Sequence, residues 1–140
     1  MSKYLGVDFG LKRIGLSITD QEKIFAFPLT TIEFDNAFNF FKDLFLKEEI
    51  SKLIIGYPKR LSGVDSDIES SIKIFITKFK KQFPAIEIKR FDERFTSKLA
   101  SKAIVSSGLG KKKRSDKSLI DKVSAAIILQ DYLTYNKSNL

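Results

Sequence analysis

The chain has 140 residues, of which 43% are hydrophobic and 13 are phenylalanine, and this predicts one domain, residues 1–140, with a sizeable core. It contains no Cys and no His, which excludes disulfides, thiolate nucleophiles, imidazole bases and zinc sites built on these residues. A formal net charge of +8 favours a polyanionic partner, although charge alone is equally compatible with an ordinary basic cytosolic protein.

An enzyme of this composition would activate water with carboxylates or with a metal held on carboxylates. Oxygen ligands suit Mg²⁺ or Mn²⁺ better than zinc. No apolar run approaches the ~20 residues of a membrane span. The N-terminus lacks the pattern of a secretory signal, so we expect a cytoplasmic protein with no membrane partner.

Apolar periodicity predicts three strands followed by alternating helices and strands. The expected strands cover residues 3–9, 14–19, 24–31, 52–57 and 86–91. The expected helices begin at the candidate caps Asp35, Ser66 and Thr96 or Ser97 and at about Ser118, and they end near Glu49, before Pro84, at Ser106 and near Tyr135. The short turns between the first three strands indicate an antiparallel meander. The uninterrupted apolar run 53–55 is typical of a strand covered on both faces.

The C-terminal helix is apolar almost all round at its centre, residues 123–129. We therefore expect it to pack against the sheet and not to lie on the surface. Ser124 and Ala125, one turn beyond Asp121, are small and would let the helix backbone come close to the sheet. The phenylalanines at helical spacing are expected to form the core and not to provide a surface on which bases stack.

Three acidic residues occupy unusual positions. Asp8 lies inside an apolar strand between two glycines, where a carboxylate needs a cation or several hydrogen-bond donors. Glu93 follows the strand 86–91, at the end where ligand-contacting residues gather in parallel sheets. Asp121 lies on the helix expected to be buried.

Each acid alone has an ordinary explanation. Asp8 could cap the turn, Glu93 could pair with Arg90 or Arg94, and Asp121 could be favoured by the helix dipole. The three together favour a shared metal site. Two divalent ions ~4 Å apart on such acids can activate water and stabilise the leaving oxygen in phosphodiester cleavage without histidine.

Cationic side chains flank these acids along the chain. A loop of four consecutive cations shortly precedes the helix that carries Asp121, and two more follow Asp8 in the first turn. Either group could simply be solvated, but if the acids face a nucleic acid, both are placed to hold its phosphates. The candidate nucleic-acid contacts are Lys12, Arg13, Arg94, Lys111, Lys112, Lys113 and Arg114.

Four motifs in succession resemble those of the YqgF (RuvX) family. They are Asp8-Phe9-Gly10-Leu11-Lys12-Arg13-Ile14-Gly15, Ile54-Ile55-Gly56-Tyr57-Pro58, Asp92-Glu93-Arg94-Phe95-Thr96-Ser97, and the run from Ile120-Asp121-Lys122 to Gln130. The resemblance implies the α/β ribonuclease H-like fold shared with the RuvC Holliday junction resolvases, a five-stranded mixed sheet in the order 3-2-1-4-5 flanked by helices. It also implies that Asp8, Glu93 and Asp121 take the three acidic metal-ligand positions.

The resemblance further implies a nuclease dependent on Mg²⁺ or Mn²⁺, acting on structured RNA or branched DNA as a monomer or weak homodimer. Processing of the 5′ end of pre-16S ribosomal RNA is our first expectation, with Holliday junction resolution as the alternative. A binding module without catalysis stays open, as does an ATP-binding half of the actin and sugar-kinase type, which uses two such domains where this chain holds one. The loop Ser62-Gly63-Val64 departs from the residues frequent in the family, so its role is left open.

Overall fold

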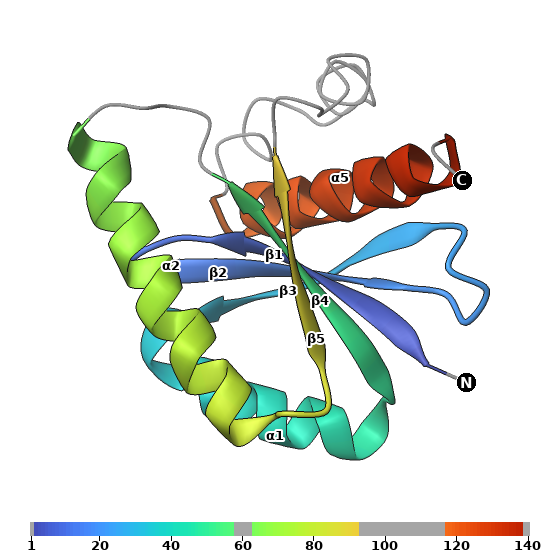
Figure 1. Cartoon of the computed structure of the whole chain (residues 1–140), viewed down its shortest axis with the longest axis horizontal. Helices are drawn as coiled ribbons and strands as arrows, with labels where there is room; N and C mark the ends of the chain where they lie inside the picture. The colour runs from blue at the N-terminus through green and yellow to red at the C-terminus, as the bar shows by residue number, and fades with distance from the viewer. Residues whose placement is uncertain (1, 58–62, 93–116, 139–140) are drawn as a thin grey trace.

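A computed structural model describes residues 2–57, 63–92 and 117–138 (Figure 1). Its strands are β1 (Lys3–Phe9), β2 (Arg13–Thr19), β3 (Ala26–Glu33), β4 (Ile50–Tyr57) and β5 (Glu87–Asp92). Its helices are the 3-10 turn η1 (Phe34–Asn36), α1 (Ala37–Lys47), α2 (Gly63–Gln82) and α5 (Lys117–Ser138). The helix expected from Thr96 or Ser97 to Ser106 lies outside the described residues.

The five strands form one mixed sheet in the order β3-β2-β1-β4-β5, which confirms the expected topology. The first three strands pair antiparallel because the turns between them are short. β4 pairs parallel to β1, and β5 pairs parallel to β4. The carboxyl ends of β1, β4 and β5 therefore meet at one edge of the sheet.

The two faces of the sheet are covered by different helices. In Figure 1, α1 and α2 lie on one side of the sheet and α5 lies on the other. Ile14 and Leu16 are fully buried in the core shared with α1 and α2, whereas the alternate residues Gly15 and Ser17 of β2 lie against α5. The alternation expected for the second strand is confirmed.

Phenylalanine dominates the core between the sheet and the first two helices. Phe41 of α1 is fully buried, and its ring centroid lies 5.5 Å from that of Phe79 in α2 and 5.7 Å from that of Phe45. Such rings contribute both buried area and favourable edge-to-face contacts. The prediction that these residues form the core is confirmed.

Two expected starts of elements are wrong by a few residues. Asp35 does not cap a helix, because it lies within η1, and α1 begins at Ala37. The strand expected from Ile24 begins at Ala26, because the Asp20 carboxylate accepts hydrogen bonds at 2.9 Å from the backbone N–H groups of both Ile24 and Phe25 and extends the turn. The N–H groups of Phe25 and Ile24 also hold the pKa of Asp20 below its usual value.

The expected start of the second long helix is also wrong, because the helix begins earlier than the sequence predicts. α2 begins at Gly63, three residues before the expected cap Ser66.

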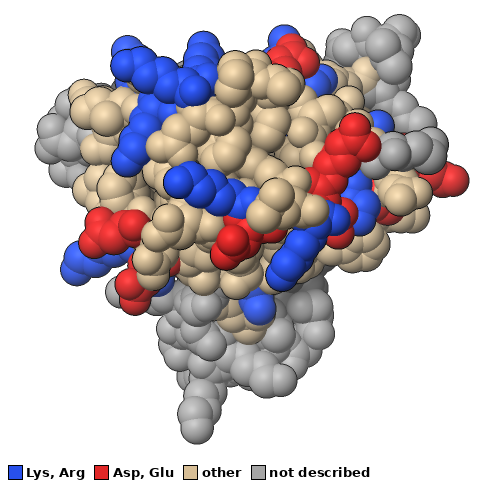
Figure 2. Space-filling view, turned by 90° about the horizontal axis from the view of Figure 1, so that it is seen from below, with Lys and Arg blue, Asp and Glu red and all other residues tan. Residues whose placement is uncertain are grey.

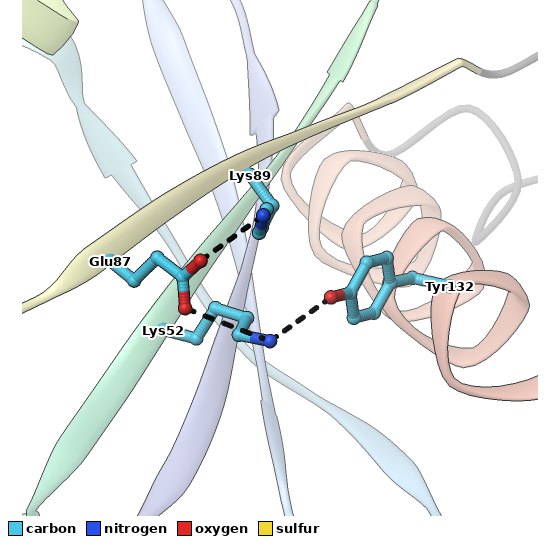
Figure 3. A network of polar contacts seen from close by, with 4 residues as sticks. All are labelled: Lys52, Glu87, Lys89 and Tyr132. Carbon is cyan, nitrogen blue, oxygen red and sulfur yellow. Dashed lines mark hydrogen bonds and ion pairs between the residues drawn. The ribbon is translucent and has the colours of Figure 1, made fainter. Parts of the chain in front are cut away.

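The C-terminal half of α5 is attached to β4 through a lysine (Figure 3). Lys52 donates a hydrogen bond to the Tyr132 hydroxyl at 3.2 Å and lies 3.9 Å from Glu87, which in turn pairs with Lys89 at 3.1 Å. Burial disfavours the charge on Lys52, but the hydrogen bond to Tyr132 and the electrostatic attraction of Tyr132, Tyr4 and Glu87 together outweigh it, and the pKa of Lys52 is raised. The amine thus stays charged where α5 crosses the amino-terminal part of β4.

Replacing Phe41 by Ala should lower the free energy of unfolding by about 3–5 kcal/mol, because it opens a cavity among packed rings. Leu46→Ala, on the same helix, is the matched control, since Leu46 is 87% exposed. It should change stability by no more than about 0.5 kcal/mol. Urea denaturation of both variants measures the difference, and equal losses would contradict the assignment of this core.

Candidate functional site

Asp8 lies on β1 beside strands that carry glycine. It is directly opposite Gly15 of β2. On the other side, the last recorded pair between β1 and β4 is Val7 with Ile55, so the next residue of β4 is Gly56. The Asp8 side chain, which is half-buried, is thus bordered by strands with no side chains of their own at these two positions.

The backbone of α5 comes into close contact with β1 and β2. A Cβ atom on Gly15 would collide with the carbonyl group of Asp121, and one on Gly6 would lie 3.0 Å from the Ala125 carbonyl oxygen. The Ser17 hydroxyl donates a buried hydrogen bond of 2.7 Å to that same Ala125 oxygen. The close approach expected from the small residues of this helix is confirmed.

These contacts bring Asp8 and Asp121 to the same face of the sheet. Residues directly opposite one another on antiparallel strands project their side chains to the same side. Asp8 therefore projects to the side on which Gly15 meets Asp121, which is the side covered by α5. Two of the three acids expected to share a site thus lie on the same face of the sheet.

The side chain of Asp121 forms an ion pair with Arg13. The Nε atom of Arg13 donates to Asp121 Oδ2 at 3.0 Å, and the side chains of Arg13 and Asp121 are 37% and 25% exposed. Arg13 is the first residue of β2 and lies two residues before Gly15, so both project toward α5. Lys12, the neighbouring candidate, is exposed.

The remaining candidates, Glu93, Arg94 and the cations 111–114, lie outside the described residues. Glu93 follows directly on Asp92, the last residue of β5, whose Cα partner on β4 is Tyr57. Among the residues that the structure describes, no group of three acids comes together. Arg90, one proposed partner of Glu93, makes an ion pair of 2.7 Å with Glu69 of α2.

Positive charge is unevenly distributed along the chain. Residues 58–62 and 93–116 contain nine of the 25 Lys and Arg but only two of the 17 Asp and Glu. On the described surface both signs are interspersed, as Figure 2 shows for one face of the molecule. The net charge of +8 therefore resides mainly in the segments that follow β4 and β5.

Two contacts between α5 and the rest of the protein were not predicted from the sequence, those of Arg13 and those of Gln130. Arg13 was expected to bind phosphate, and its pairing with Asp121 was not foreseen. Gln130 was not singled out, yet its side chain accepts from the N–H of Ala26 at 2.9 Å and donates to the Ile24 carbonyl at 3.1 Å. An amide directly after the apolar run 123–129 was the signal that pointed to it.

None of the helices within residues 2–57, 63–92 and 117–138 combines the length and apolar character needed to cross a membrane.

Comparison with known proteins gives consistent matches. Residues 2–135 match the family model described as "RuvX: Holliday junction resolvase". A protein of Flavobacterium psychrophilum named "Putative pre-16S rRNA nuclease" is 48% identical over 134 residues, which is 96% of this chain and 98% of that protein. A protein of the same name from Flavobacterium johnsoniae is 46% identical, with 96% and 97% covered.

Among solved structures, RuvC of T. thermophilus in complex with a Holliday junction substrate resembles this chain with a TM-score of 0.58. The alignment covers 96% of both chains at 11% sequence identity. A likeness at this low identity shows that the two proteins share a fold.

Gly15→Ala should destabilise the protein by about 1–3 kcal/mol, because the added methyl group meets the backbone of α5 and not a side chain that can move aside. Urea denaturation measures the effect. Asn39→Ala, on the exposed surface of α1, is the control and should unfold like the unmodified protein. If Gly15→Ala also unfolded like the unmodified protein, the close contact between β2 and α5 would be disproved.

Proposed function

The chain belongs to the RuvX family, and from this premise we propose that it is a metal-dependent nuclease that processes the precursor of 16S ribosomal RNA. The family expected from the four sequence motifs is thereby confirmed. The observation that supports the proposed activity is the position of Asp8 directly opposite Gly15, the glycine that the backbone of Asp121 meets.

The described residues fit a divalent cation in two respects. Carboxylate oxygens are the donors that Mg²⁺ and Mn²⁺ prefer. The absence of a side chain at Gly15 leaves α5 close to the sheet, where an added Cβ would separate it from Asp8. We propose that Asp8 and Asp121 hold the metal together with Glu93, which follows the end of β5 in the chain.

In this proposal a bound metal pair supplies an activated water and neutralises the oxygen that leaves the phosphodiester. The chain's own residues orient the reacting groups and bind the nucleic acid. Asp8 and Asp121 orient the reacting groups from two rigid elements, a central strand and a packed helix. Lys12, Arg13, Arg94 and the cations 111–114 bind phosphates on either side and hold the nucleic acid in register.

RNA is the substrate that we propose first. Relatives that are 46–48% identical over nearly their whole length are named for pre-16S ribosomal RNA. The family description names the Holliday junction, which supports resolution of branched DNA as the second candidate. We propose that the protein works in the cytoplasm as a monomer or weak homodimer.

Asp8→Asn and Asp121→Asn should each lower the cleavage rate by at least about 100-fold while the proteins stay folded, because each removes a negative ligand from the site. The assay offers labelled pre-16S RNA and a four-way DNA junction in parallel, with Mg²⁺, with Mn²⁺ and with chelator. Asp43→Asn, on the exposed surface of α1, is the matched control and should cleave at the unmodified rate.

The two substrates separate the candidate functions. Metal-dependent cleavage of RNA alone supports the first proposal, and cleavage of the junction alone supports the second. Binding of either substrate without any cleavage in metal would contradict both and identify a binding module.

A further inference from the structure

We propose that Arg13 is the resident counter-ion of Asp121, which a divalent cation must displace before the site is loaded. This inference rests on the proposed metal-dependent function and adds a role for Arg13 distinct from simple phosphate binding. It is carried by the ion pair between Arg13 and Asp121 and by the position of Asp8 beside it.

Arg13 pairs with Asp121 although another acidic residue lies on the neighbouring strand. The Cα partner of Arg13 across the sheet is Glu33 of β3, so a second acid lies on the neighbouring strand. The guanidinium nevertheless pairs with Asp121 on α5, with an Nε–Oδ2 distance of 3.0 Å. Among the contacts recorded for the described residues, Asp121 is the single ion-pair partner of Arg13.

The fold creates a need for a cation at this point. The contact at Gly15 brings the Asp121 backbone to the strand position opposite Asp8, so two acidic residues lie on one half-buried face of the sheet. Like charges so placed repel, and partial burial strengthens the repulsion. The Arg13 guanidinium offsets this repulsion when no metal is bound.

The Arg13 guanidinium and a divalent cation compete for the Asp121 carboxylate. A divalent cation that uses Asp121 as a ligand meets a carboxylate already neutralised by a guanidinium. The Arg13 side chain is 37% exposed, so it can turn toward solvent while its backbone stays fixed in β2. The released guanidinium then lies beside the site and can pair with a substrate phosphate through two parallel hydrogen bonds. Loading of metal and capture of phosphate are coupled through one side chain.

The test measures metal binding in the absence of nucleic acid. Titration of Mn²⁺ by calorimetry is carried out on the unmodified full chain, on Arg13→Gln and on Arg13→Lys. Arg13→Gln should bind Mn²⁺ about two- to fivefold more tightly, the range that corresponds to losing one partly exposed ion pair. Arg13→Lys, which keeps the charge, should stay close to the unmodified affinity. Lys42→Gln, on α1, removes an equal charge elsewhere and should leave the affinity unchanged.

Thermal melting in chelator gives a second, independent measurement. Arg13→Gln should melt at a lower temperature than the unmodified protein, because Asp121 then loses its ion-pair partner. Arg13→Gln should lower the melting temperature less when it is introduced into a protein that already carries Asp121→Asn, because that protein has one negative charge fewer to neutralise. Additive effects of the two changes would overturn the counter-ion role.

The outcomes separate this inference from the proposed function. Equal or weaker Mn²⁺ binding by Arg13→Gln, with normal binding by the unmodified protein, overturns the displacement of Arg13 and leaves the nuclease proposal intact. If the unmodified protein binds no Mn²⁺ and cleaves neither substrate, the metal-dependent function fails and this inference fails with it.

Discussion

The direct contact between the backbone of α5 and the glycines of β1 and β2 determines the geometry of the candidate site. A helix packed on a sheet is ordinarily held off by a layer of side chains. Here Gly6 and Gly15 remove that layer, so the Asp121 and Ala125 carbonyls approach the strands themselves. The position of the Asp121 carboxylate relative to Asp8 follows from this contact, because any intervening side chain would move the helix and its acid away from the sheet.

The two faces of the sheet hold their helices by different means. α1 and α2 pack through phenylalanine rings, which stabilise strongly but impose little direction on any one contact. α5 packs on the sheet through a smaller apolar cluster and adds directed polar contacts along its length, from Arg13 through Ser17 to Lys52. Hydrogen bonds and ion pairs depend steeply on geometry, so this face fixes the register of α5 along the strands. Apolar packing therefore stabilises both faces, and the polar contacts that fix the position of a helix belong to the α5 face.

Much of this arrangement could be predicted from local sequence, and some of it could not. The alternation of Ile14 and Leu16 with Gly15 predicted the two faces of β2, because a strand has a strict period of two residues. The strand order came from the family resemblance and not from periodicity. The cap at Asp35 was wrong because a short 3-10 turn competed with the helix for the same residues. The pair of Arg13 with Asp121 was out of reach, since local patterns carry no information on which strand end lies beneath which helix turn.

The uneven distribution of charge has a consequence for how the protein meets a polyanion. The described scaffold is close to electrically balanced, whereas the two cation-rich segments begin where β4 and β5 end, at the edge of the sheet toward which Asp8 lies. A net charge of +8 attracts a polyanion before the two molecules touch, so it raises the rate of association. Raising the ionic strength should slow association, because salt shortens the range of this attraction.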